Sequence, residues 1–150
     1  MDQLIVNVEK LYDDAQLPTK GSEEAAGWDL YAYVPDKMPI HLAPHTTTPI
    51  STGIAIDIES GWEGEIRPRS GIAAKRGLRP INTPGTIDAD YRGPVIVALH
   101  NDSDYEQIVQ HGERIAQMLF HPVPVVRWYE VNKLSETVRG AGGFGSTGEK

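Results

Sequence analysis

The chain has 150 residues, 39% of them hydrophobic, which allows one buried core and excludes two ordinary domains. Fourteen Lys and Arg stand against 21 Asp and Glu, and the net charge of -7 argues against a nucleic-acid partner. The lack of cysteine excludes disulfides and thiolate sites.

The first ten residues lack the basic and apolar regions of a secretion signal, and no apolar run has membrane-spanning length. We therefore expect a soluble intracellular protein without a membrane partner, and take the cytoplasm as its default location.

Glycine and proline occur throughout the chain, 15 and 11 times, and favour many short strands over long helices. Several segments alternate apolar and polar residues with a period near two, as strands do. We expect strands around residues 4–9, 28–33, 54–58, 94–100, 113–120 and 125–131.

One short stretch, residues 70–76, reads as a helix, with Ser70 as its cap and Gly77 at its end. The expected fold is all-β, a jelly-roll-like distorted β-barrel with one short helix. Residues 139–148 contain five glycines, and we expect this C-terminal arm to be flexible when nothing binds it.

Three motifs lack a residue, spacing or element that their function requires. Residues 140–145 match the dinucleotide fingerprint formally, but too few residues follow to form the helix that it must open. Residues 88–93 begin like a calcium loop, yet Leu99 stands where the bidentate carboxylate is needed. The five histidines have no zinc-ligand spacing.

Five segments carry the residue types needed to hold a nucleoside triphosphate, and in this order they closely resemble the motifs of the trimeric dUTPase family. They span nearly the whole chain, and the last reads as an almost unbroken RGxGGFGSTG. The segments are 26–30, 68–77, 82–93, 114–117 and 139–148.

The resemblance implies a nucleoside site in the third segment. Asp88 is then the base that deprotonates the attacking water, and Tyr91 packs beneath the deoxyribose and excludes a 2′-hydroxyl. Uracil recognition falls to Asn82 and to backbone groups near Ile96, with Gly85 also at the substrate.

The same resemblance implies a phosphate site in the second segment, where Arg69, Ser70 and the Gly71 amide lie at the start of the helix. Mg²⁺ is expected as cofactor, held mainly by the phosphates and by waters, without direct protein ligands. Asp29 and Gln117 correspond to residues that touch the waters of the metal or the phosphate network.

The arm corresponds to a segment that closes over bound substrate. Phe144 would stack on uracil, and Arg139, Gly145, Ser146 and Thr147 would surround the γ-phosphate. The family architecture implies a homotrimer that binds dUTP in sites shared between chains, with a body of residues 1–138 and an arm of residues 139–150.

The implied reaction is hydrolysis of dUTP to dUMP and pyrophosphate by water attack on the α-phosphorus, which keeps uracil out of DNA and supplies dUMP for thymidylate synthesis. Two alternatives are a dCTP deaminase of the same fold and a regulatory module that holds a protein partner. Trp28 and Thr83–Pro84 depart from the commonest family pattern.

From the residues alone, plainer roles stay open. They are a helix cap for Ser70, a solvated side chain for Arg69, the polar turn of a hairpin for Asp88 and Asp90, a packing aromatic for Tyr91, a buried structural hydrogen bond for Asp29, an exposed strand position for Gln117, and a structural role for Arg114.

Overall fold

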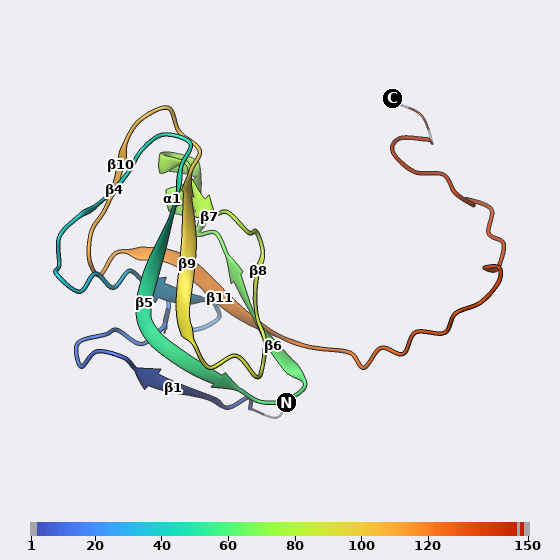
Figure 1. The fold of residues 1–150 in the computed structure, drawn as a ribbon, viewed down its shortest axis with the longest axis horizontal. Coiled ribbons are helices and arrows are strands. Elements are labelled where there is room, and N and C mark those ends of the chain that lie inside the picture. Colours follow the sequence, from blue (N-terminus) through green and yellow to red (C-terminus); the bar gives the residue numbers. More distant parts are fainter. Residues whose placement is uncertain (1–2, 147, 149–150) are drawn as a thin grey trace.

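The computed structural model describes residues 3–146 and 148, and strands make up most of its regular structure (Figure 1). The elements are β1 (Val6–Lys10), β2 (Thr19–Lys20), β3 (Trp28–Tyr31), β4 (Ile40–Leu42), β5 (Thr47–Ile58), β6 (Trp62–Arg67), α1 (Ser70–Arg76), β7 (Leu78–Pro80), β8 (Gly85–Ile87), β9 (Pro94–Asn101), β10 (Gln107–Val109) and β11 (Arg114–Pro122).

Within the described ranges the strands form two larger antiparallel sheets and one short pair. One sheet has the order β1-β5-β9-β7, the other has the order β2-β3-β11-β6-β8, and β10 pairs with β4. An all-β fold with one short helix is thereby confirmed. The neighbours β8 and β9 belong to different sheets, so the segment between them crosses from one sheet to the other.

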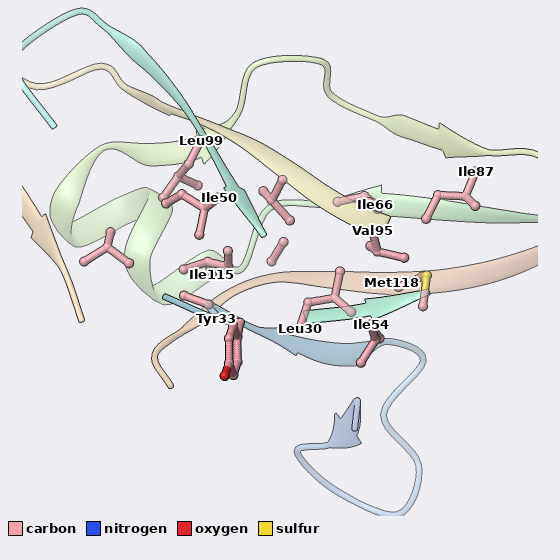
Figure 2. Close-up of a cluster of buried hydrophobic side chains, with 14 of the residues drawn as sticks. Leu30, Tyr33, Ile50, Ile54, Ile66, Ile87, Val95, Leu99, Ile115 and Met118 are labelled. Carbon is pink, nitrogen blue, oxygen red and sulfur yellow. The ribbon is translucent and has the colours of Figure 1, made fainter. Parts of the chain in front are cut away.

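The core lies between the two larger sheets (Figure 2). Leu30, Ile66 and Met118 come from the five-stranded sheet, and Ile54 and Val95 come from the four-stranded one. Burial of these side chains is the main favourable term that holds the layers together.

Strand β9 explains how one strand serves both the core and a surface site. Every second residue from Val95 to Asn101 is buried, while Ile96 between them is exposed. Because side chains alternate between the faces of a strand, the register that buries Val95 and Val97 turns Ile96 outward.

Helix α1 ends as expected and begins differently. Gly77 adopts a left-handed conformation with φ 65, and its N–H donates to the Ala73 carbonyl, which ends the helix. The prediction that Ser70 caps the helix is wrong, because Ser70 is its first residue. Arg69 takes the cap position with an extended backbone and without a capping side-chain bond.

Beyond β11 the described chain extends away from the sheets (Figure 1). The prediction of a strand at 125–131 is wrong for a single chain. Val125, Val126 and Val131 are all exposed, so this segment packs against no partner strand within the described residues. Among those residues, no helix combines the length and apolar character that a membrane crossing needs.

Candidate active site

A cavity of about 210 Å³ opens where the two larger sheets part, and we call it the inter-sheet pocket. It brings together five residues that the sequence placed at the nucleoside. Its lining consists of Ile66, Asn82, Gly85, Thr86, Ile87, Asp88, Tyr91, Pro94, Val95 and Ile96.

The segment between β8 and β9 carries the polar residues of this pocket. Asp88 follows β8 directly, and the Tyr91 N–H donates to the Asp88 carbonyl oxygen at 3.1 Å, which closes a turn. Sequence reasoning allowed this segment to be the turn of a hairpin. It is a crossing between sheets instead, since β8 pairs with β6 while β9 pairs with β5 and β7.

Tyr91 is held at the rim of the pocket by its hydroxyl group, which donates to the Pro94 carbonyl oxygen at 2.9 Å. Gly93 makes room for this arrangement. A Cβ atom at Gly93 would lie 2.4 Å from the Tyr91 hydroxyl oxygen, so any side chain there would displace the ring.

Asn82 reaches the pocket from the loop that precedes β8. Gly85 is buried, and a Cβ atom there would lie 3.1 Å from Asn82 Nδ2. Glycine thus lets the amide approach the start of β8. The same loop contains a cis peptide bond between Thr83 and Pro84.

A second set of predicted residues lies around Asp29 on β3. This aspartate is buried and accepts hydrogen bonds from Arg69 Nε at 3.0 Å and Arg114 Nη1 at 3.3 Å. Because a buried carboxylate needs such partners, the two arginines compensate its desolvation. We call Asp29, Arg69 and Arg114 the Asp29 cluster.

Gln117 lies opposite Asp29 in the β3–β11 register, so the two side chains share one face of the sheet. Its Nε2 donates to the Pro68 carbonyl oxygen at 3.0 Å. Gly27 packs against this side chain so closely that a Cβ atom would lie 2.2 Å from Gln117 Oε1. Glycine at position 27 therefore leaves the room that the glutamine side chain occupies.

Ser70 and Gly71 begin α1 directly after Arg69, and both are exposed. The space around Gly71 is open, since a Cβ atom there would meet nothing within 4 Å. In this single chain Arg69, Ser70 and Gly71, which the sequence placed at the phosphates, do not line the inter-sheet pocket.

The arm lies apart from both sets. Phe144 is fully exposed with φ 48, Arg139 Nε donates to the Gly142 carbonyl at 2.7 Å, and the Ser146 N–H donates to Gly143 at 3.0 Å. Gly145 also has a positive φ. Thr147 lies outside the described residues.

Sequence reasoning missed the partnership of Arg114 with Asp29, and it missed Arg92, which pairs with Asp57 beside the turn. The acidic partners of these arginines lie far away in the sequence, so only the three-dimensional structure reveals the two ion pairs. Over residues 3–146 and 148, no group of three or more His, Asp or Glu side chains is arranged to hold a metal ion.

The fold and the site define an all-β protein with a pocket between its two larger sheets and a buried carboxylate bound by two arginines. A family model described as dUTPase matches residues 13–148. The chain is 50% identical over 143 residues to the deoxyuridine 5′-triphosphate nucleotidohydrolase of Hydrogenobaculum sp. (strain Y04AAS1), covering 95% of this chain and 97% of that protein. It is 47% identical over 139 residues to the enzyme of the same name from Maricaulis maris (strain MCS10), covering 93% and 91%.

Among solved structures, the dUTPase of Staphylococcus bacteriophage 80alpha with dUPNHPP is similar, with a TM-score of 0.84 at 26% identity. The match covers 97% of this chain and 99% of that one. The chain belongs to the dUTPase family, and the family named from the five sequence segments is confirmed.

Proposed function

We propose that this protein is a dUTP diphosphatase that hydrolyses dUTP to dUMP and pyrophosphate. The observation that carries the proposal is the inter-sheet pocket, which is lined by Asn82, Asp88, Tyr91 and Ile96 in a chain whose relatives are named deoxyuridine 5′-triphosphate nucleotidohydrolases. In a cell this activity keeps uracil out of DNA and supplies dUMP for thymidylate synthesis.

Asn82 and the backbone of β9 near Ile96 recognise uracil. Uracil and cytosine exchange an acceptor for a donor on one edge, so fixed hydrogen-bonding groups leave the wrong base with unpaired polar atoms. Support comes from the position of both residues in one pocket, with the buried Gly85 between them in sequence.

Tyr91 excludes ribonucleotides by its bulk. Its ring lines the pocket and its hydroxyl is tied to the Pro94 carbonyl, so the ring cannot swing aside without losing that hydrogen bond. A 2′-hydroxyl beneath the sugar then has no space.

Asp88 acts as the general base. Its carboxylate is exposed at the pocket, where it can accept a proton from a water that attacks the α-phosphorus. The oxygen of that water forms the new bond to phosphorus, and the bond to the bridging oxygen breaks, so pyrophosphate leaves.

Arg69, Ser70 and the Gly71 amide bind the phosphates. Arg69 Nε donates a hydrogen bond to Asp29, and the remaining N–H groups of the guanidinium can donate to an anion. The exposed start of α1 leaves Gly71 open to close approach by phosphate oxygens. Arg114 Nη1 donates to the other oxygen of the Asp29 carboxylate and so helps to hold it in place.

The donor set around Asp29 fits a hydrated Mg²⁺ bound to the substrate. Asp29 and Gln117 offer carboxylate and amide oxygens on one face of the sheet, and such groups accept hydrogen bonds from metal-bound waters. When bound, the ion neutralises charge that develops on the phosphate oxygens.

The division of the chain into a body of residues 1–138 and a closing arm of residues 139–150 is part of this proposal. Phe144 stacks on uracil, and Arg139, Gly145, Ser146 and Thr147 surround the γ-phosphate. The chain acts as a homotrimer in which each site takes its base, its phosphate-binding residues and its arm from different subunits. The exposed arm and the separate lining of the inter-sheet pocket support this arrangement.

One assay separates this function from its rivals. Incubation with dUTP, and in parallel with dCTP, in the presence of Mg²⁺ is scored for pyrophosphate and for ammonia. Pyrophosphate from dUTP without ammonia from dCTP is the expected result. Release of ammonia would indicate a deaminase. If neither product is released, the regulatory binding module is the remaining alternative.

Shared sites are tested by complementation. Asp88→Asn and a chain truncated before Arg139 are refolded together in equal amounts. If base and arm come from different subunits around a closed three-membered ring, roughly a quarter of all sites recover activity. If refolded mixed trimers are no more active than the separate variants, base and arm belong to one chain.

A further inference from the structure

A chain of polar contacts runs from β1 to the turn that carries Asp88 and Tyr91. Asn7 Nδ2 donates to Asp57 Oδ2 at 3.4 Å, and Arg92 Nη2 lies 2.8 Å from Asp57 Oδ1. Asn7 and Asp57 are register partners in the β1–β5 pair. Both carboxylate oxygens of Asp57 are therefore engaged, one by the sheet and one by the turn.

The same arginine grips the turn itself. Arg92 Nη1 donates to the Ala89 carbonyl oxygen at 2.6 Å and to the Tyr91 carbonyl oxygen at 3.3 Å. These two carbonyls stand on either side of Asp90. A planar guanidinium that binds two carbonyls and a carboxylate at once holds its partners in one geometry, which an ammonium group cannot reproduce.

Arg92 does this from outside the substrate site. It does not line the inter-sheet pocket, and lines a separate hollow together with Asn7 and Asp57. Any effect of Arg92 on the reaction must pass through the backbone of the turn.

We propose that Arg92, anchored by Asp57, is a positioning residue that sets the turn from Asp88 to Tyr91, and thereby sets both the general base and the barrier to ribose. The inference rests on the proposed function. It assigns Arg92 a role in sugar specificity although the residue does not line the inter-sheet pocket.

The variants are Arg92→Ala, Arg92→Lys and Asp57→Asn, with Lys37→Ala as matched control. Lys37 forms an ion pair with Asp14 that is about as exposed, with side chains 43% and 57% accessible against 57% and 47% for Arg92 and Asp57. Neither Lys37 nor Asp14 lines the inter-sheet pocket. Each variant is measured for kcat and KM with dUTP and UTP, for thermal unfolding, and for hydrogen exchange at the Tyr91 amide.

Arg92→Ala is expected to lower the dUTP to UTP ratio of kcat/KM by about three- to tenfold, the size expected when a half-exposed charged contact is lost. The dUTP kcat should fall with it, because Asp88 moves with the turn. Exchange at the Tyr91 amide, which bonds to the Asp88 carbonyl, should become faster. Arg92→Lys should recover part of each effect, and Asp57→Asn should shift them in the same direction by less.

Unchanged specificity and unchanged Tyr91 exchange in folded Arg92→Ala, or effects no larger than those of Lys37→Ala, would overturn the proposal. If Arg92→Ala fails to fold, the same measurements on Asp57→Asn test the proposal. A wild-type protein that releases no pyrophosphate from dUTP would contradict the proposed function instead. The exchange rates would still show whether Arg92 holds the turn.

Discussion

Asp88 and Tyr91 are joined through the backbone, because the Tyr91 N–H donates to the Asp88 carbonyl oxygen at 3.1 Å. The proposed base and the proposed barrier to ribose are therefore the two ends of one turn. A change that moves either end should affect both turnover and sugar specificity, although not to the same extent.

Gly93→Ala should admit UTP. The new Cβ would lie 2.4 Å from the Tyr91 hydroxyl oxygen, so the ring must swing away from the Pro94 carbonyl and open space beneath the sugar. The dUTP to UTP ratio of kcat/KM should fall, as it should in Tyr91→Ala. An unchanged ratio in both folded variants would mean that ribose is rejected elsewhere.

Asp88→Asn should keep dUTP affinity and lose turnover by about 10²–10⁴-fold, because an amide preserves the shape but cannot accept the proton of the water. Steady-state kcat and equilibrium binding of a non-hydrolysable analogue check the two halves. Retention of more than about a tenth of the wild-type kcat would remove Asp88 from the role of base.

Gly27→Ala should displace Gln117, the register partner of Asp29, and leave the inter-sheet pocket unchanged. The added Cβ would lie 2.2 Å from Gln117 Oε1, so the glutamine must turn away and lose its bond to the Pro68 carbonyl. We expect a loss of about 1–3 kcal/mol in the free energy of unfolding. Gly21→Ala is the control, since its Cβ would meet only Asp29 Oδ2, at an ordinary 4.0 Å. Equal stability of the two variants in urea would contradict this packing.

Acid should remove one contribution to stability in a defined range. Hydrogen bonds from Lys37 and then from Tyr33 lower the pKa of Asp14 to about 2 in the folded protein. Because the unfolded carboxyl has a higher pKa, this stabilisation is complete above about pH 4 and is lost as the pH falls through about 2.

Asp14→Asn should therefore flatten the decline of the free energy of unfolding between pH 4 and pH 2. The effect should shrink in high salt, since the Lys37 pair is exposed. Asp13→Asn, which removes the neighbouring carboxyl, is the matched control. Identical pH profiles for Asp14→Asn and the wild type would exclude this source of acid sensitivity.

The strands of the core could be predicted from the sequence because alternation and burial agree there. The expected strand at 94–100 is β9, and the one at 113–120 lies within β11 except for its first residue. Short strands such as β8 were missed, since three residues carry too little periodicity. The segment 125–131 was predicted as a strand because its apolar residues recur with a period near two, but it has no partner in the described chain.

Several candidate site residues could be expected to lie together because they are close in sequence. Asn82, Gly85, Asp88 and Tyr91 come from one stretch, and Ile96 joins them through the register of β9. The contacts of Arg92 with Asp57 and of Arg114 with Asp29 could not be predicted, because each joins segments that are far apart in the sequence.

Hydrolysis of dUTP in water enriched with ¹⁸O shows directly which phosphorus atom the water attacks. Wild-type protein with Mg²⁺ should release dUMP that carries the label on its phosphate, together with unlabelled pyrophosphate, because the water attacks the α-phosphorus. Label in pyrophosphate would place the attack at the β-phosphorus and contradict the geometry proposed for Asp88, and the absence of both products would contradict the function itself.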